Sequence, residues 1–288
     1  MIFVGSHRLS SVNSEPTNDF AERTQMILKG KNAVIYGAGG DIGSAIARAF
    51  AREGARLFLS GRTPGSVNAL ASEIVSRGGM AEAARIDALD EQAVERYLSQ
   101  VVEKAGSIDI SFCAISVAKV LANKLPLVEL SAEQFALPIS AYTQSNFLTA
   151  RAAARTMVQK RAGVILTIVG IPGRIGFPNV GGNGPAYAAV EALSRGLSAE
   201  LAPHGVRVLC LMPNAIPETA TIRENFARYA KAAGSSPAEY QARLESTTHH
   251  RRLSTLAELA NTAVFLASDQ ASGMTGTVVN LSGGAVPG

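Results

Sequence analysis

The chain has 288 residues, and its 27 Lys and Arg against 23 Asp and Glu leave a net charge of only +4. Hydrophobic residues make up 47% of the chain and charged residues 17%, a balance that excludes an intrinsically disordered protein and supplies enough apolar material for a core. The small positive excess does not indicate a nucleic-acid partner. The sequence contains no run of about 18 apolar residues, so no membrane span is expected.

Two cysteines are too few for a disulfide framework. Cys113 and Cys210 each lie in a short apolar run that is typical of a buried strand. We therefore expect two reduced core thiols and a cytoplasmic location, where thiols stay reduced. Adjacent side chains such as His249 and His250 would diverge on a helix and rarely share one metal, so no metal site is expected.

Taken in chain order, residues 1–25 are polar and show little periodicity, which predicts a flexible N-terminal tail. Residues 26–288 are expected to form one domain, in which short apolar runs alternate with helical patterns. We predict strands at 32–36, 55–60, 81–86, 108–114, 163–169, 206–212 and 275–281. We predict helices at 42–54, 65–78, 91–106, 147–160, 188–201 and 255–268. This alternation predicts an α/β fold with a parallel sheet covered on both faces.

Residues 213–250 interrupt the alternation, because three prolines surround two short helical patterns there. Ligands of open α/β sheets bind beyond the carboxyl ends of the strands. The interrupting segment follows the sixth predicted strand, so we expect it to form a lid over that crevice.

The first predicted strand runs directly into a glycine-rich loop with the sequence GAGGDIG, and a helix follows. Glycine permits a tight turn and a close approach of the backbone to a phosphate, and the helix N-terminus offers free N–H groups to the anion. This context predicts dinucleotide binding, with a purely structural loop as the alternative. The cofactor-binding candidates in the loop are Gly37, Gly40, Asp41, Ile42 and Gly43.

Asp41 is unusual in such a loop, because a carboxylate that pointed inward would repel the pyrophosphate. Its side chain could instead point outward and cap the helix that follows.

The second predicted strand ends at Gly61 and Arg62. Chains that bind NAD usually carry an acidic residue there, which accepts hydrogen bonds from the ribose hydroxyls. An arginine suits the 2′-phosphate of NADP(H) instead, so the sequence favours NADP(H) over NAD(H). The alternative is that Arg62 is a solvated loop charge.

At this point the sequence resembles the short-chain dehydrogenase/reductase family over roughly residues 29–285. The resemblance is carried by KNAVIYGAGGDIGSAIARAFAREGA, the SGR turn, IDALDEQAV, GVILTIV, SAELAPHGVRVLCLMP and LANTAVFLASDQASGMTGTVVNLSGG, in that order. It implies a Rossmann-like, doubly wound, seven-stranded sheet, a nicotinamide cofactor, a small-molecule substrate, and a homodimer or homotetramer. It also implies that Asp87 lies against the adenine, with further cofactor contacts from Ala88, Ala114, Tyr187, Pro213 and Ile216.

Catalysis in this family usually depends on an Asn, a Ser, a Tyr and a Lys four residues after the Tyr. The segment AAVEALSRGLSAEL matches the family helix without a gap only when Tyr187 takes the lysine position and Asn183 the tyrosine position. The serine position is then Gly170, 13 residues before Asn183, and the asparagine position is Tyr142. All four positions are thus substituted. The alternative, with Tyr187 as the tyrosine and Glu191 in place of the lysine, needs a compensating insertion and deletion.

Three functions remain open. The first is an oxidoreductase that transfers hydride between NADP(H) and a small carbonyl or alcohol, with Tyr142 or Tyr187 as a replacement acid. The second is a cofactor-binding protein without turnover, acting as a sensor or partner subunit. The third is a non-redox isomerase or lyase. The fold alone does not choose among them.

Overall fold

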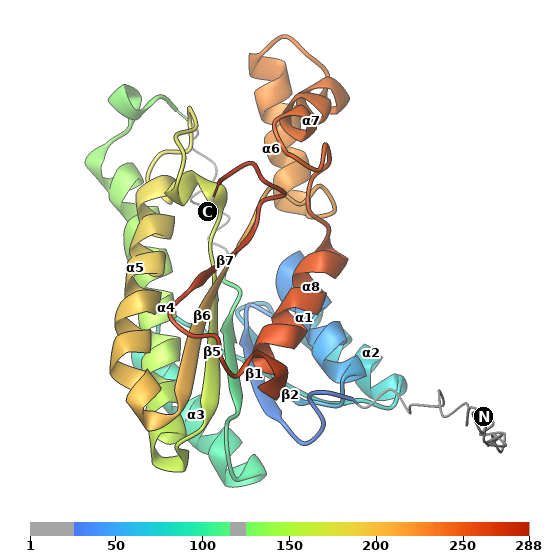
Figure 1. Cartoon of the computed structure of the whole chain (residues 1–288), viewed down its shortest axis with the longest axis vertical. Helices are drawn as coiled ribbons and strands as arrows, with labels where there is room; N and C mark the ends of the chain where they lie inside the picture. Colours follow the sequence, from blue (N-terminus) through green and yellow to red (C-terminus); the bar gives the residue numbers. More distant parts are fainter. Residues whose placement is uncertain (1–25, 116–124, 288) are drawn as a thin grey trace, which may run out of the picture.

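Seven parallel strands form one sheet in the computed structural model, which describes residues 26–115 and 125–287 (Figure 1). The predicted tail over residues 1–25 lies outside the described residues. The strands are β1 (Asn32–Tyr36), β2 (Arg56–Gly61), β3 (Met80–Arg85), β4 (Ile110–Cys113), β5 (Gly163–Ile168), β6 (Val206–Pro213) and β7 (Val278–Leu281). Their spatial order, β3-β2-β1-β4-β5-β6-β7, confirms the doubly wound sheet and places its switch point between β1 and β4.

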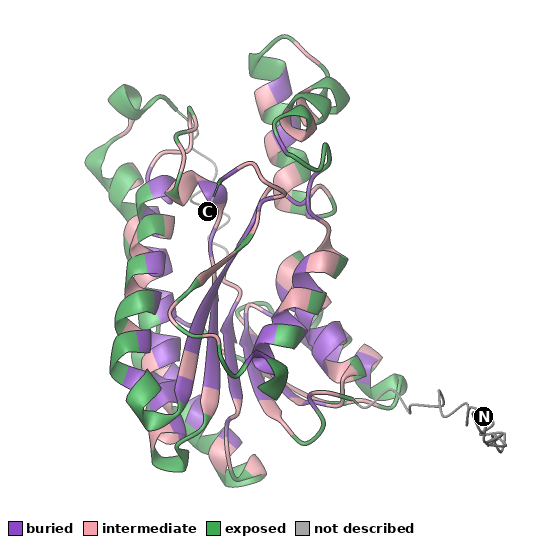
Figure 2. Ribbon diagram, viewed as in Figure 1, coloured by how far each residue is buried: buried purple, intermediate pink, exposed green. Residues whose placement is uncertain are grey.

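Two helical layers cover the sheet, and a helical pair stands apart from both (Figure 1). One layer contains α1 (Asp41–Arg52), α2 (Pro64–Ser76) and α8 (Leu256–Ala267). The other contains α3 (Glu91–Ala105), α4 (Ala132–Lys160) and α5 (Asn183–Leu201). The separate pair, α6 (Ala220–Ala232) and α7 (Pro237–Ser246), matches the two short helical patterns of the predicted lid. Figure 2 shows the central strands as the most buried elements and the lid helices as mostly exposed.

The observed strands agree with the predicted ones to within three residues at each end, but one helix was predicted much too short. Helix α4 begins at Ala132, whereas the sequence pattern predicted a start at residue 147. Ser131 and Gln134 form a reciprocal capping box at its N-terminus, which fixes this earlier start. The helix continues past Pro138, which has no backbone N–H and so cannot donate a hydrogen bond within the helix.

Both cysteines are buried free thiols, as predicted. Burial raises the pKa of the Cys210 thiol to about 12, and burial likewise raises the pKa of Cys113. Within the described residues, no helix has the combination of length and hydropathy that crossing a membrane would require.

The N-terminus of α8 carries a pH-dependent contribution to stability. Glu258 accepts hydrogen bonds from Arg252 and from the backbone of Thr255, and these partners lower its pKa from 4.5 to about 2, with Arg252 as the largest cause. A carboxyl group whose pKa is lower in the folded state stabilises that state above the unfolded pKa. The contribution is lost as the pH falls from about 4.5 toward 2.

We therefore expect Glu258→Gln to lower the free energy of unfolding at pH 7 by about 1 kcal/mol, a value reduced by the solvent exposure of the ion pair. The difference from the unmodified chain should shrink as the pH is lowered from 5 to 3. Urea unfolding at several pH values tests this. Glu103→Gln, on the exposed face of α3, is the control. A deficit that stays constant with pH would contradict the assignment.

Candidate cofactor and active site

The glycine loop lies at the switch point of the sheet and leaves no room for side chains. Gly37 has a φ of +73°, and a Cβ there would lie 2.7 Å from the carbonyl oxygen of Ala114. A Cβ at Gly43 would lie 2.4 Å from the carbonyl oxygen of Gly37. The N–H of Gly40 donates to that same oxygen at 3.1 Å, and Gly40 is the N-cap of α1. The loop therefore presents bare backbone and a helix N-terminus, which suits a phosphate.

Asp41 does not cap α1, so that possibility is wrong. The N-cap Gly40 has no side-chain hydrogen bond, and Asp41 occupies the first turn of the helix. Its Oδ2 instead accepts a hydrogen bond from the backbone N–H of Ala220 at 2.7 Å. Ala220 is the first residue of α6, where N–H groups lack partners within the helix. Asp41 thus binds the N-terminus of the lid helix rather than that of its own helix.

The other cofactor-binding candidates follow the carboxyl ends of neighbouring strands. Gly61 ends β2, and Arg62 after it is exposed, with no hydrogen bond or ion pair to any described residue. Asp87 follows β3, and its carboxylate accepts from the N–H of Leu89 at 3.1 Å. Ala88 is buried beside it. The guanidinium of Arg62 is therefore available to an anionic ligand.

Further candidates line the same edge of the sheet. Ala114 follows β4 and donates its N–H to the carbonyl oxygen of Tyr36 at 2.9 Å. Pro213 ends β6, and Ile216 beyond it is buried. Ile42, in the first turn of α1, is partly buried against the core. These positions all lie where an open α/β sheet binds its ligand.

Three of the four predicted catalytic positions lie side by side. The rings of Tyr142 on α4 and Tyr187 on α5 have centroids 5.5 Å apart and planes inclined at 59°. A Cβ at Gly170, which follows β5, would lie 3.0 Å from Cε2 of Tyr187. The tyrosine ring therefore occupies space that a serine side chain at position 170 would need.

The surroundings of Tyr187 keep its hydroxyl protonated. Burial raises its pKa well above the ordinary value of 10, and the neighbouring Tyr142 raises it further. Although part of the Tyr187 side chain remains accessible, both effects disfavour the phenolate. A tyrosine in this state can give up a proton to a stronger base formed during a reaction, but it is not a general base near neutral pH.

Asn183, which the sequence analysis aligns with the usual tyrosine, is the first residue of α5. Its Nδ2 donates to the carbonyl oxygen of Val180 at 2.8 Å. Its Oδ1 is buried and has no hydrogen-bond partner among the described residues. A buried acceptor without a partner is uncommon, and it can receive a hydroxyl or amide donor from a ligand.

An ion pair beside the site was not predicted. Glu191 is buried, and its Oε2 accepts from Nε of Arg174 at 2.6 Å, with Arg195 3.7 Å away. Arg174 immediately follows the short 3-10 helix η3 (Ile171–Gly173). The pairing joins a loop to α5 across the fold, so nothing in the local sequence pattern indicates it. The Glu191 carboxylate that would take the lysine position in the alternative alignment is thus bound to arginine.

The lid helices pack on each other through aromatic side chains. The ring centroids of Phe226 and Tyr240 are 5.6 Å apart, and those of Tyr229 and Tyr240 are 5.7 Å apart. The Tyr229 hydroxyl donates to the carbonyl oxygen of Asn179 at 3.4 Å. Since Asn179 precedes α5 and Asp41 begins α1, the lid is joined to both sides of the candidate site.

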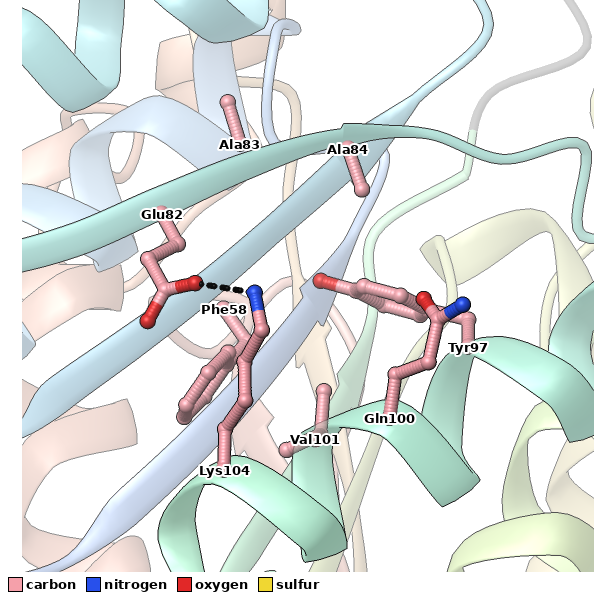
Figure 3. Close-up of a pocket in the computed structure, with 8 residues that line it drawn as sticks. All are labelled: Phe58, Glu82, Ala83, Ala84, Tyr97, Gln100, Val101 and Lys104. Atoms are coloured by element: carbon pink, nitrogen blue, oxygen red, sulfur yellow. Dashed lines mark hydrogen bonds and ion pairs between the residues drawn. The ribbon is translucent and has the colours of Figure 1, made fainter.

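A cavity of about 170 Å³ lies elsewhere, between β2, β3 and α3 (Figure 3). Its polar lining includes the ion pair between Glu82 and Lys104, at 2.7 Å. It contains none of the predicted site residues and is smaller than the ~300 Å³ at which ligand pockets usually begin. The candidate site therefore remains the switch-point crevice. Among the described residues, no three His, Cys, Asp or Glu side chains are grouped so as to hold a metal ion.

The comparisons with known proteins agree with this geometry. A family profile described as enoyl-(acyl carrier protein) reductase matches residues 37–286, from the glycine loop to the end of the described chain. The chain belongs to the short-chain dehydrogenase/reductase family of oxidoreductases, and solved structures similar to it share this fold.

Individual relatives cover almost the whole chain. An uncharacterized oxidoreductase, YxjF of Bacillus subtilis, is 30% identical over 256 residues, which is 88% of this chain and 96% of the relative. An L-rhamnose 1-dehydrogenase (NAD(P)(+)) of Azotobacter vinelandii is 30% identical over 264 residues, or 90% and 98% of the two chains. The crystal structure of sorbitol-6-phosphate 2-dehydrogenase from Erwinia amylovora superposes with a TM-score of 0.83 at 26% identity, covering 88% of this chain and 99% of that one.

The residues present fit a nicotinamide dinucleotide in all respects but one. At Gly37 and Gly43 a side chain would overlap neighbouring backbone atoms, so the loop consists of bare backbone that a phosphate can approach closely. Arg62 offers a cation at the end of β2. The exception is the Asp41 carboxylate at the N-terminus of α1.

Proposed function

We propose that this protein is an NADP(H)-dependent oxidoreductase that transfers hydride between the cofactor and a small carbonyl or alcohol, with a non-standard active site. The observation that carries the proposal is the Tyr142–Tyr187 pair beside Gly170, at the edge of the sheet that also holds the glycine loop. The bound nicotinamide would supply the hydride chemistry. The protein would hold the dinucleotide by the glycine loop and Arg62, and would supply the proton from a tyrosine hydroxyl.

The substrate class is proposed from the site and from the relatives together. The buried Oδ1 of Asn183 lacks a donor, so a substrate with a hydroxyl group next to the reacting carbon would satisfy it. Dehydrogenases of rhamnose and of sorbitol 6-phosphate are among the similar proteins. We propose a small hydroxylated carbonyl compound, or the corresponding polyol, as the substrate.

A second candidate function, cofactor binding without turnover, is favoured by one observation. Gly170 provides no side-chain donor for a carbonyl, and the usual tyrosine is replaced by Asn183, which cannot donate a proton. Titration of NADPH and NADH, followed by nicotinamide fluorescence, is the first experiment, since the chain has no tryptophan. Binding followed by turnover of a hydroxylated carbonyl supports the oxidoreductase, binding alone supports the second candidate, and no binding contradicts both.

The preference for NADP(H) has its own test. We expect Arg62→Asp to weaken NADPH binding about 30-fold and to leave NADH binding equal or stronger, because a carboxylate repels the 2′-phosphate and accepts from ribose hydroxyls. Fluorescence titrations of both cofactors measure this. Arg77→Asp, at the end of α2, makes the same charge change away from the strand ends. An unchanged ratio of the two affinities would show that Arg62 does not read the 2′-phosphate.

We propose a homodimer or homotetramer in the cytoplasm. Support comes from large apolar side chains that are exposed at and before the start of α4. Val128 is 94% exposed and Leu127 63%, and Phe135 and Leu137 are also exposed. A second copy of the chain would cover such surface. Light scattering of the purified protein tests the assembly.

A further inference from the structure

We propose that the Asp41 carboxylate ties the lid to the start of the cofactor loop and opposes the approach of the dinucleotide pyrophosphate, so that cofactor binding loosens the tie. The inference rests on the proposed cofactor binding but concerns its regulation. Asp41 lies between Gly37 and Gly43, two positions at which a Cβ would overlap backbone atoms, and its carboxylate is the one acidic group in the loop sequence GAGGDIG.

The carboxylate lies where two helices begin. It belongs to the first turn of α1, and its Oδ2 accepts from the N–H of Ala220, the first residue of α6, at 2.7 Å. Both helix N-termini carry partial positive charge, which favours an anion near them. A dinucleotide pyrophosphate is attracted to the N-terminus of α1 for the same reason. The two anions compete, because a carboxylate beside the pyrophosphate repels it.

The hydrogen bond from Ala220 to Asp41 is long-range. It holds the pair α6 and α7, whose packing is mainly of one helix on the other. The separation along the chain is 179 residues. Helix α6 packs chiefly against α7, which agrees with the isolated position of the pair in Figure 1. A second carboxylate, that of Glu218, accepts from the N–H of Leu256 at 2.7 Å and fixes the other side of the same turn to α8. Asp41 therefore ties the lid to the cofactor loop, and Glu218 ties it to the scaffold.

Two substitutions at Asp41 separate the hydrogen bond from the charge. Asp41→Gly removes both, and Asp41→Asn removes the charge but keeps an oxygen acceptor. We expect NADPH to bind about tenfold tighter to Asp41→Gly, and about threefold tighter to Asp41→Asn. Adenosine 2′-monophosphate, which lacks the pyrophosphate, should bind equally to all three chains. Asp269→Asn makes the same charge change at the opposite end of the sheet, beside Lys31, and is the control.

Hydrogen exchange of the cofactor-free chains provides a readout that does not depend on activity. The amide of Ala220 should exchange about tenfold faster in Asp41→Gly than in the unmodified chain, and at an unchanged rate in Asp269→Asn. Equal exchange would overturn the tie between loop and lid. Faster exchange with unchanged or weaker NADPH binding would overturn the competition between carboxylate and phosphate. If none of the chains binds NADPH or NADH, the proposed function fails. The exchange rate of the Ala220 amide then tests by itself whether Asp41 holds the lid to the loop.

Discussion

Gly43→Ala should abolish high-affinity binding of NADPH and destabilise the fold. The added Cβ would lie 2.4 Å from the carbonyl oxygen of Gly37 and 2.9 Å from Cα of Ala38. Both are backbone atoms of the same tight loop, so the overlap is relieved only by moving the loop away from α1. We expect at least a ~100-fold loss of NADPH affinity and a loss of about 2–4 kcal/mol in the free energy of unfolding.

The matched control is Gly65→Ala, in the first turn of α2, where an added Cβ meets nothing within 4 Å and φ is not positive. This variant should bind NADPH normally and unfold at the same or slightly higher urea concentration, because alanine favours a helix. Fluorescence titration and urea unfolding of both variants provide the measurements. Normal NADPH binding by Gly43→Ala would show that the close approach in the loop serves the fold and not the cofactor.

The sheet could be predicted from the sequence because its signals are local. The central strands are nearly continuous apolar runs, as in GVILTI, and burial on both faces requires that composition. The start of α4 was missed because its signal lies in a capping box at Ser131, followed by seven residues that mix apolar and polar types and include Pro138. A cap sixteen residues before the periodic segment carries little weight against a proline inside the helix.

The candidate site could be predicted only in part, because several of its contacts depend on the tertiary fold and leave no local pattern in the sequence. Gly170 and Tyr187 were assigned neighbouring roles by counting positions, and the structure places the Tyr187 ring 3.0 Å from where a Cβ of residue 170 would lie. Three contacts had no local signal: Asp41 with Ala220, Glu191 with Arg174, and Tyr229 with Asn179. Each joins elements that are brought together only by the complete fold.

Two features of the proposed site depart from the family pattern. At the glycine loop, Asp41 adds an acid where the loop otherwise offers bare backbone. In the proposed assignment, Gly170 and Tyr187 replace the usual serine and lysine, and the Tyr187 ring lies where a side chain at position 170 would extend. Both changes weaken interactions that a dinucleotide oxidoreductase commonly uses. Together they predict slow turnover and weak cofactor affinity in the unmodified chain.

Tyr187→Phe should lower kcat for carbonyl reduction by about 10²–10⁴-fold with little change in KM, because it removes the proposed proton donor and preserves the ring. The raised pKa of Tyr187 fixes the pH dependence. A general acid works while it is protonated, so the reductase rate of the unmodified chain should not decline through this group up to about pH 10.

Tyr142→Phe should lower kcat less, by about tenfold, because in the proposed mechanism Tyr142 supports Tyr187 through their contact. Removing its hydroxyl also removes one cause of the raised pKa of Tyr187, so any alkaline decline of the rate should move to lower pH in this variant. Tyr240→Phe, within the aromatic packing of the lid, is the control and should keep its kcat. Steady-state kinetics of the three variants and of the unmodified chain across pH 6–10 test these expectations. Unchanged kinetics in both Tyr142→Phe and Tyr187→Phe would exclude the pair as the proton source.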